Sequence, residues 1–423
     1  MCGIFGWYGN IDKEEKQYII EQGYLRGRDG YGMLYDNNIK RSINKIDLKS
    51  DKELIDDVIH SNSCIGNFRA TPTTEILSKV EYMQPYSGIV HNGVISNDKD
   101  IADVPIDSMV LPFVFPEGTR NLKDIKKNIN KLVGSYAIAF YNENNTKLYL
   151  ITNYKPIYYR RNKSGIVFTS IPEMLKYEST PISPYTINEI DLSTFELSTI
   201  STHTVENKKV LVSASAGLDS TTVAYMLKSE GYDVTLIHFL YGCLAESNEI
   251  TRIKQIAEHG DFKLDFIEMP KIFNGTIVSN DYHKGGVEGT EYAMDWVSAR
   301  NLLMMSLLTA YSETHNYSYI AFGGNLEEGG AYPDNEEEFA RKFNELLPYS
   351  TQNGKIIKML HPLTRFMKHE IIKLGNEVDV PWELTWSCYS DNEEHCGECG
   401  PCFMRKTAFE RNHITDPVFN HKK

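Results

Sequence analysis

The residue with the clearest chemical potential is the cysteine that directly follows the initiator in Met1-Cys2-Gly3-Ile4-Phe5-Gly6. If the methionine is removed, Cys2 becomes the first residue and its thiol lies beside a free α-amino group. Free α-amino groups have pKa values of roughly 7.7–8.0 and free thiols about 8.5, so one residue supplies a nucleophile and a proton acceptor near neutral pH. The alternative is a small, half-buried cysteine without a catalytic role.

Four short polar motifs follow Cys2: Arg26-Gly27-Arg28-Asp29-Gly30, Asn67-Phe68-Arg69-Ala70-Thr71, His91-Asn92-Gly93 and Asp107-Ser108. Taken singly, each is typical of an ordinary turn. In this order behind an N-terminal cysteine, they resemble the class II glutamine amidotransferases, whose domain is an Ntn-hydrolase αββα sandwich. The resemblance covers roughly residues 2–200.

This resemblance implies a role for each matching position. Cys2 would attack the side-chain amide of glutamine, and Asn92 with the backbone N–H of Gly93 would form the oxyanion hole. Ammonia released into bulk water would be protonated and lose its nucleophilicity, so a second, ammonia-consuming site is expected downstream. The implied substrate-binding residues are Arg69 for the α-carboxylate, Asp107 for the α-ammonium group, and Arg26 and Thr71 within the same motifs.

The composition is that of a globular protein, with 41% hydrophobic and 24% charged residues in a chain of 423, enough for two domains. No apolar run approaches the roughly 18 residues that span a bilayer, and the N-terminus lacks the basic flank of a signal peptide. We therefore expect a cytoplasmic protein, without a membrane partner, whose seven cysteines are reduced, catalytic or metal-bound. The net charge of −13 argues against a generally basic nucleic-acid surface.

A polar Ser/Thr-rich stretch at residues 198–207 is interpreted as a linker, which predicts domains at 2–200 and 207–423. Beyond it, strand and helix patterns alternate, which predicts a doubly wound parallel sheet with ligands at the carboxyl ends of its strands. The predicted strands are 209–212, 234–241, 264–269 and 319–322, and the predicted helices are 220–228, 248–259 and 293–311.

The first predicted strand runs into Ser213-Ala214-Ser215-Ala216-Gly217-Leu218-Asp219-Ser220-Thr221-Thr222, directly before a helix. Small residues there let backbone N–H groups point at an anion, and the helix N-terminus adds partial positive charge. The segment lacks the ending of a Walker P-loop and resembles the Ser-Gly-Gly-x-Asp-Ser signature of the PP-loop ATP pyrophosphatases. The resemblance implies binding of ATP with Mg²⁺ held by Asp219. The implied cofactor-binding residues are Ser213, Ser215, Ala216, Gly217, Leu218, Asp219, Ser220 and Thr221.

Ala216 departs from that family, because a glycine usually stands at its position. A methyl group there is expected to crowd the pyrophosphate or to restrict φ.

A cysteine cluster lies near the C-terminus, in Thr385-Trp386-Ser387-Cys388-Tyr389 and His395-Cys396-Gly397-Glu398-Cys399-Gly400-Pro401-Cys402. Four thiolates with two consecutive C-x2-C steps favour a structural tetrahedral Zn²⁺ site, and an iron–sulfur cluster is the main competing metal centre. His395 is expected to lie outside the metal shell. Cys64 and Cys243 lack such partners and are predicted to be core residues or bystanders.

A PP-loop domain that ends in this cysteine cluster resembles the QueC family of 7-cyano-7-deazaguanine synthases, from about Val210 to Phe409. Arg300 and Asp334 would then contact substrate or ATP near strand ends, although each fits equally well as a salt-bridge partner at the sheet rim. The other matching segments are Tyr241-Gly242, Val297-Ser298-Ala299-Arg300-Asn301, Tyr332-Pro333-Asp334 and Pro362-Leu363 followed by Lys368.

The whole chain therefore resembles a glutaminase fused to a QueC-like synthase. The leading hypothesis is a glutamine-dependent, ATP-consuming ligase that delivers ammonia to the 7-position carboxyl or nitrile of a 7-deazaguanine. One alternative is an archaeosine-synthase-like reaction that forms an amidine on tRNA or DNA; another is an asparagine synthetase. A third treats the synthase half as an inactive scaffold that binds a deazaguanine. The sequence does not determine the oligomeric state, and a homo-oligomer is compatible with it.

Overall fold

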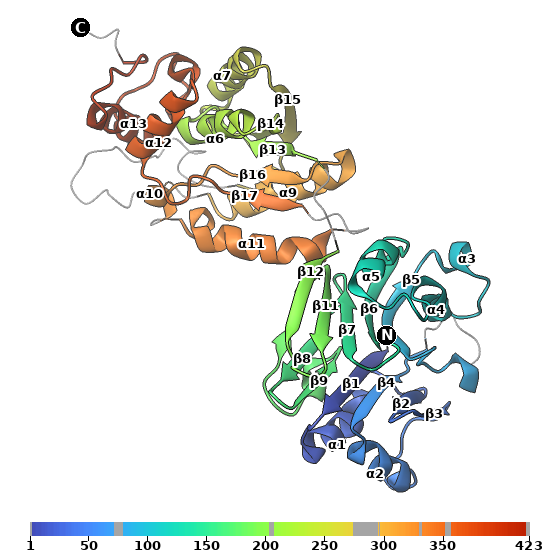
Figure 1. Cartoon of the computed structure of the whole chain (residues 1–423). Coiled ribbons are helices and arrows are strands. Elements are labelled where there is room, and N and C mark those ends of the chain that lie inside the picture. Colours follow the sequence, from blue (N-terminus) through green and yellow to red (C-terminus); the bar gives the residue numbers. More distant parts are fainter. Residues whose placement is uncertain are drawn as a thin grey trace. The chain divides into compact units, whose positions relative to one another are not determined.

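The computed structural model describes residues 2–71, 79–202, 207–273, 295, 297–329, 332–351 and 357–419 (Figure 1). These residues form two compact units, which separate between Thr202 and Asn207. Among the described residues, every helix is too short or too polar to cross a lipid bilayer.

The first unit contains a seven-stranded antiparallel sheet within the described residues. Strand β1 lies inside this sheet, and its first residue, Gly3, is opposite Phe68 of β4. The position of Cys2 is therefore fixed by the start of a paired strand. In order across the sheet the strands are β10 (Thr180–Pro181), β8 (Tyr158–Arg161), β9 (Gly165–Thr169), β1 (Gly3–Gly9), β4 (Ser63–Phe68), β2 (Tyr31–Tyr35) and β3 (Asn38–Ser42).

A second antiparallel sheet packs against the first one. Apolar side chains such as Ile4 and Phe168 of the first sheet share one buried cluster with Ala139 and Leu150 of the second. The Tyr141 hydroxyl also crosses between the sheets and donates to the Trp7 carbonyl at 2.9 Å. The strands of this sheet are β12 (Leu197–Ser201), β11 (Thr186–Asp191), β7 (Lys147–Thr152), β6 (Gly134–Tyr141) and β5 (Ile89–Ile95).

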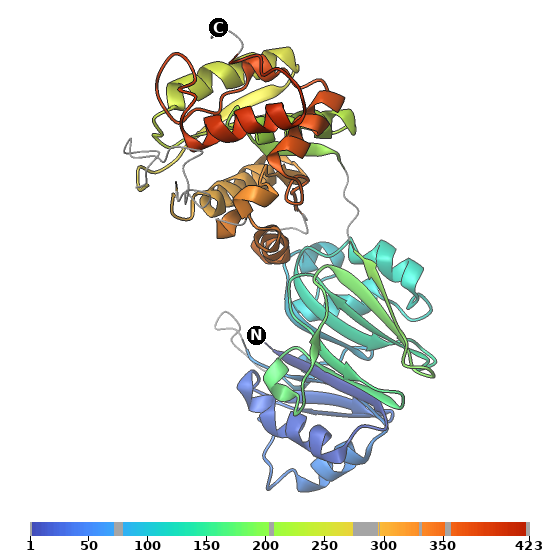
Figure 2. The ribbon, with the colours of Figure 1, turned by 90° about the vertical axis from the view of Figure 1, so that its left-hand side faces the viewer.

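Helices cover the outer faces of both sheets, as Figure 2 shows. Helices α1 (Lys13–Gln22) and α2 (Lys52–His60) bury their apolar sides against the first sheet. Helices α4 (Leu111–Val114) and α5 (Leu122–Ile129) do the same on the second sheet, beyond the short α3 (Asp98–Ile101). The unit is the αββα sandwich that the sequence predicts.

The second unit is built on a parallel sheet whose strand order reverses at β13. Consecutive strands run from β13 to one edge, and the chain then returns to the other side of β13 as β16. Such a reversal places a crevice at the carboxyl ends of the strands, where ligands bind. The order is β15 (Lys263–Glu268), β14 (Asp233–Leu240), β13 (Lys209–Ser213), β16 (Tyr319–Ala321) and β17 (Lys358–Leu360).

Helices pack on both faces of this sheet (Figure 1). One face buries Val210 and Val212 under α6 (Leu218–Ser229), α7 (Glu246–His259), α12 (Lys368–Glu377) and α13 (Gly400–Arg411). The other face buries Leu211 and Ile237 under α9 (Arg300–His315) and α11 (Glu337–Ser350). The short α10 (Leu326–Gly329) follows β16. The predicted doubly wound α/β fold is thus confirmed.

Two expectations from the sequence are corrected. The predicted linker begins too early, because residues 197–201 form the edge strand β12, whose exposed serines and threonines read as a loop. The long helix predicted at 293–311 begins at Arg300 and ends at His315. Ala299 has a left-handed φ of 52°, which stops the helix on its N-terminal side; Ala293 lies outside the described residues.

Candidate active sites

Cys2 lies at the start of β1, next to the first two polar motifs. It is partly buried, and its Sγ lies 3.9 Å from the Ala70 carbonyl oxygen. The two motifs are joined, because the Asp29 amide donates to the Arg69 carbonyl at 3.0 Å and the Thr71 amide donates to the Asp29 carboxylate at 2.7 Å. Arg26 is exposed on the surface of the same loop.

The predicted oxyanion-hole residues lie on β5. The side chain of Asn92 is buried, and its Oδ1 has no hydrogen-bond partner among the described residues. Gly93 has a φ of 153°, and a Cβ atom at its position would lie 1.9 Å from the Ser135 carbonyl oxygen. Only glycine fits there. The predicted role of both residues stays a prediction.

The groups predicted to bind glutamine act electrostatically on one hydroxyl, that of Tyr86. Burial raises the pKa of Tyr86, and the charge of Arg69 opposes that shift. Cys2 and Asp107 raise the pKa further. The Tyr86 hydroxyl donates to the Tyr82 carbonyl at 2.6 Å, and Arg69 Nη1 donates to the same oxygen at 3.1 Å. The thiol, the guanidinium and the carboxylate thus all influence the Tyr86 hydroxyl electrostatically.

A buried histidine that the sequence analysis left without a role supports this region. His91 Nε2 donates to the Ser135 carbonyl at 3.2 Å, so its Nδ1 accepts from the Ser108 hydroxyl at 2.8 Å. Asp107, next to Ser108, accepts backbone N–H bonds from Ile95 at 2.8 Å and from Ser108 at 2.7 Å. The Ser108 hydroxyl also lies 3.2 Å from Asp107 Oδ1, so these contacts fix the carboxylate and leave a lone pair on Oδ2 for a ligand.

In the second unit, the PP-loop connects β13 to α6. Gly217 is the N-cap of α6 and has no side-chain cap, so the first N–H groups of the helix remain for an anion. The hydroxyls of Ser215 and Ser220 lie 3.4 Å apart, and Ser220 Oγ accepts the Ser215 amide at 3.2 Å. The loop is therefore preformed.

Ala216 has a left-handed φ of 61° and is fully buried. Its methyl group belongs to the apolar cluster under α6 and does not line the pocket described below. Crowding of the pyrophosphate by this methyl group stays a prediction, whereas the expected backbone restriction is observed, since L-residues lose about 1–2 kcal/mol in this conformation.

Asp219 is held in a buried ion triad. Its Oδ2 accepts from Lys368 Nζ at 2.5 Å and from Asn325 Nδ2 at 3.0 Å, while its Oδ1 has no partner among the described residues. Lys368 Nζ also donates to Glu328 at 3.2 Å. Burial by itself lowers the pKa of Lys368, but the two carboxylates outweigh it and raise that pKa. Lys368 is therefore a fixed cation at the pocket wall.

A cavity of about 790 Å³ opens at the carboxyl ends of β13, β14 and β16. Its wall includes six of the eight predicted cofactor-binding residues; Ala216 and Thr221 are the exceptions, and the Thr221 hydroxyl instead donates to the Gly217 carbonyl at 2.7 Å. The wall also contains ionisable groups that no sequence motif indicated, among them His238, Glu249 and Glu328. The histidine inside the apolar strand Leu236-Ile237-His238-Phe239 was an available signal.

Arg300 and Asp334 both line this cavity. Arg300 Nη1 donates to the Tyr241 hydroxyl at 3.2 Å, and its buried Nε has no partner among the described residues. Asp334 accepts the Asn301 amide at the start of α9 at 3.3 Å. Within the described chain neither residue forms an ion pair, so the salt-bridge alternative is not supported, and their contact with a ligand stays a prediction.

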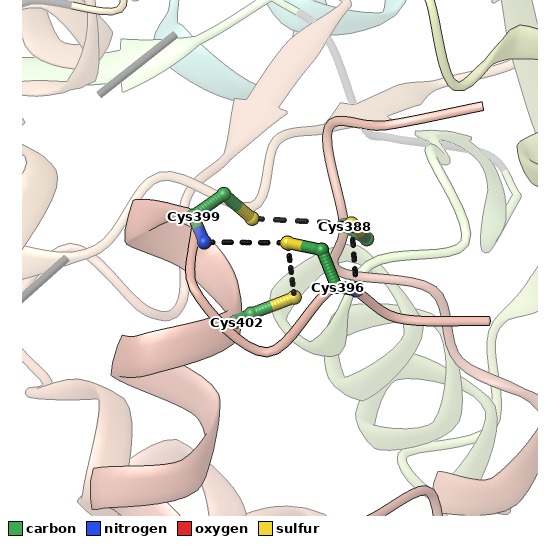
Figure 3. A group of neighbouring side chains, drawn as sticks. All are labelled: Cys388, Cys396, Cys399 and Cys402. Carbon is green, nitrogen blue, oxygen red and sulfur yellow. Dashed lines mark hydrogen bonds between the residues drawn. The ribbon is translucent and has the colours of Figure 1, made fainter. Parts of the chain in front are cut away.

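The four C-terminal cysteines converge, as Figure 3 shows. The sulfurs of Cys388, Cys396, Cys399 and Cys402 all lie within 4.8 Å of one another. Backbone amides donate to two of them, as when Cys396 N–H points at Cys388 Sγ at 3.3 Å, which stabilises thiolates. Four thiolates in this arrangement fit a tetrahedral metal ion. His395 is outside the cluster, because its Nε2 accepts the Ser387 amide at 3.0 Å.

The cysteine cluster is tied to the PP-loop through Trp386. The Trp386 amide donates to the Ala216 carbonyl at 2.8 Å, and its indole donates to the Cys388 carbonyl at 2.8 Å. Fully buried Arg405 of α13 supports the same segment, since it donates to Thr385 Oγ1 at 2.6 Å and pairs with Asp416 at 2.7 Å. A metal at the cluster would thus brace the loop.

Comparison with known proteins identifies relatives that align with the whole chain and others that align with about half of it. The family model of the queuosine biosynthesis protein QueC matches residues 209–413. The 7-cyano-7-deazaguanine synthase 2 of Sulfurisphaera tokodaii is 37% identical over 99% of this chain and 99% of its own length. A 7-cyano-7-deazaguanine synthase of Methanococcus maripaludis is 38% identical over 97% of its own length but covers 50% of this chain. Among solved structures, the glutamine PRPP amidotransferase of B. subtilis complexed with ADP and GMP aligns over 100% of this chain and 98% of its own, with a TM-score of 0.40 and 14% identity.

Proposed function

This chain belongs to the family of 7-cyano-7-deazaguanine synthases, and we propose that it is a glutamine-dependent, ATP-consuming amidotransferase that acts on the 7-position carboxyl of 7-carboxy-7-deazaguanine. The observation that carries the proposal is that a 7-cyano-7-deazaguanine synthase aligned over 97% of its own length covers only 50% of this chain. The other half adds an αββα unit in which Cys2 Sγ lies 3.9 Å from the carbonyl oxygen of Ala70, the residue that follows Arg69.

In the proposed first reaction, Cys2 Sγ attacks the side-chain carbonyl of glutamine. The α-amino group takes the thiol proton and passes it to the leaving nitrogen, which departs as ammonia; water then hydrolyses the thioester to glutamate. Asn92 and Gly93 N–H would donate to the developing oxyanion.

In the proposed second reaction, a carboxylate oxygen of the deazaguanine attacks the α-phosphorus of ATP and pyrophosphate leaves. Ammonia displaces AMP to give the amide. The amide oxygen then attacks the α-phosphorus of a second ATP, pyrophosphate leaves, and loss of AMP and protons forms the nitrile. The uncapped start of α6 would receive the phosphates.

Two metal ions fit the residues present. The buried, unpartnered Asp219 Oδ1 would hold Mg²⁺, which supplies positive charge against the phosphates. The four cysteine sulfurs would hold Zn²⁺ as a structural ion.

The proposal is tested with glutamine labelled with ¹⁵N at the amide, ATP and 7-carboxy-7-deazaguanine. We expect AMP, pyrophosphate and a deazaguanine product that carries ¹⁵N. A Cys2→Ala variant should lose at least about 10³-fold of the glutamine-dependent rate and keep the rate supported by ammonium salts. Parallel reactions offer nitrile-bearing tRNA, nitrile-bearing DNA or aspartate as acceptor.

Three results would contradict the proposal: full glutamine-dependent activity in Cys2→Ala, ¹⁵N transfer only to a nucleic acid or to aspartate, or deazaguanine binding without AMP formation. An Asp219→Asn variant is the matched control, because it should lose synthesis with either nitrogen source while it still hydrolyses glutamine.

A further inference from the structure

One corner of the cavity presents several hydrogen-bond acceptors. His238 of β14 is buried, and its Nδ1 lies 2.8 Å from the Ala214 carbonyl oxygen. A carbonyl only accepts, so Nδ1 carries the proton. Burial lowers the pKa of His238, which keeps the ring neutral. Nε2 is therefore an acceptor, and within the described chain this buried atom has no hydrogen-bond partner.

The Glu249 carboxylate of α7 lies beside this nitrogen. Its Oε2 is 3.9 Å from His238 Nε2 and 3.9 Å from Cys243 Sγ. The side chain is 17% exposed, and a thiol is only a weak donor. Glu249 and His238 both belong to the cavity wall. The described residues give the Glu249 carboxylate one weak thiol donor and give His238 Nε2 none, so these acceptors remain for the donors of a ligand.

The donor pattern of the ligand follows from this corner. A guanine-type edge offers a ring N–H beside an amino group, two parallel donors that match both oxygens of a carboxylate, and the second amino hydrogen is left for a further acceptor. An adenine edge sets its amino group beside a ring-nitrogen acceptor, which a carboxylate repels. We propose that Glu249, assisted by His238, is the specificity residue that binds the ring N–H and 2-amino group of the 7-deazaguanine.

The charges around Glu249 agree with this assignment. Burial raises the pKa of Glu249 to about 7, and Arg300 opposes the shift. Two donors from the bound base would stabilise the charged form at neutral pH. The titratable groups that face the carboxylate are His238 of β14, Cys243, Glu246 of α7 and Arg300 of α9.

The test crosses an enzyme variant with a substrate analogue. Wild type and Glu249→Gln are each assayed with 7-carboxy-7-deazaguanine and with the analogue that lacks the 2-amino group, with ammonium salts as the nitrogen source. In wild type, loss of the amino group should lower kcat/KM about 10–100-fold. Glu249→Gln should lose a similar factor with the full substrate, through KM, and only a few-fold more with the analogue.

The control is Glu258→Gln, the same change at an exposed position of α7, which should match wild type. The wild-type measurement with the analogue needs no variant to fold. The inference is overturned if wild type accepts the analogue as well as the full substrate, or if Glu249→Gln raises KM for ATP and leaves KM for the base unchanged. It rests on the proposed function, and the two fail differently: a wild type that never turns over the carboxy-base refutes the function, whereas one that does so without 2-amino dependence refutes the assignment of Glu249 alone.

Discussion

Replacement of Lys368 by methionine should destabilise the second unit strongly. Lys368 Nζ lies 2.5 Å from Asp219 and 3.2 Å from Glu328, and the three side chains are only 11%, 13% and 32% exposed. Removing one partner of a buried ion pair typically costs about 3–5 kcal/mol, because the remaining charge is left in a poorly solvated place. Since Lys368 neutralises two carboxylates, we expect a loss near the upper end of that range.

The assay is urea unfolding followed by tryptophan fluorescence, to which Trp382 and Trp386 of this unit contribute. If orphaned charge is the cause, adding Asp219→Asn to Lys368→Met should recover about 2 kcal/mol, since it removes the more deeply buried carboxylate. The control is Arg365→Met, because Arg365 is 77% exposed and its ion pair with Glu337 is solvated. Its unfolding midpoint should match that of wild type.

Two results would refute this reasoning. One is a loss below about 1 kcal/mol for Lys368→Met, which would mean that water or a conformational change solvates the triad. The other is a double variant no more stable than the single one, which would assign the effect to lost packing of the lysine stem.

Other perturbations test the remaining sites. Ala216→Gly should change the unfolding free energy by less than about 1 kcal/mol, because relief of the left-handed conformation is offset by the freedom of glycine in the unfolded chain, and KM for ATP should stay constant; a tenfold lower KM would show that the methyl group hinders the nucleotide. Cys396→Ser should abolish bound zinc, measured by atomic absorption. It should also weaken ATP binding up to about tenfold in calorimetry, as expected for loss of one supporting hydrogen bond. Unchanged zinc content would exclude the four cysteines as the zinc site. Below pH 7 the Glu249 carboxylate takes up a proton, so KM for the deazaguanine should rise up to tenfold per pH unit, and Glu249→Gln should show a flat profile. Asn92→Ala should lower glutaminase kcat about 10²–10³-fold without altering ammonium-dependent synthesis; equal loss of both activities would contradict a role in the oxyanion hole.

Much of the architecture follows from local patterns. The alternation of apolar strands and amphipathic helices after residue 207 predicts the parallel sheet, because the hydrophobic periodicity of each element is visible in consecutive residues. The motif with Asp219 predicts a loop at a strand end, and the cysteine spacing predicts a compact cluster. In each case the informative residues lie close together in the chain.

Features that depend on contacts between residues far apart in the sequence could not be predicted from local patterns. Edge strand β12 is stabilised by backbone bonds to β11, which its exposed serines and threonines do not reveal. The start of α9 depends on the left-handed conformation of Ala299, which an alanine residue does not predict. The ion triad joins Asp219 to Lys368, residues far apart in sequence.

The candidate site shows the same division. Six of the eight residues quoted for the PP-loop line the cavity, but His238 and Glu249 became candidates only once β14 and α7 placed them side by side. A histidine within an apolar strand fits a core position as well as a ligand, and the three-dimensional contacts decide between the two.

The Arg405–Asp416 pair limits where the C-terminal end of the chain can be truncated or fused for experiments. Arg405 reaches the Trp382 carbonyl at 2.9 Å as well as Asp416, which lies beyond the last helix. A chain cut before Asp416 would leave a guanidinium without its counterion inside the protein, next to the segment that contacts the PP-loop through Trp386. Truncations or fusions at this terminus therefore need to retain Asp416 if nucleotide binding is to be measured on an intact pocket.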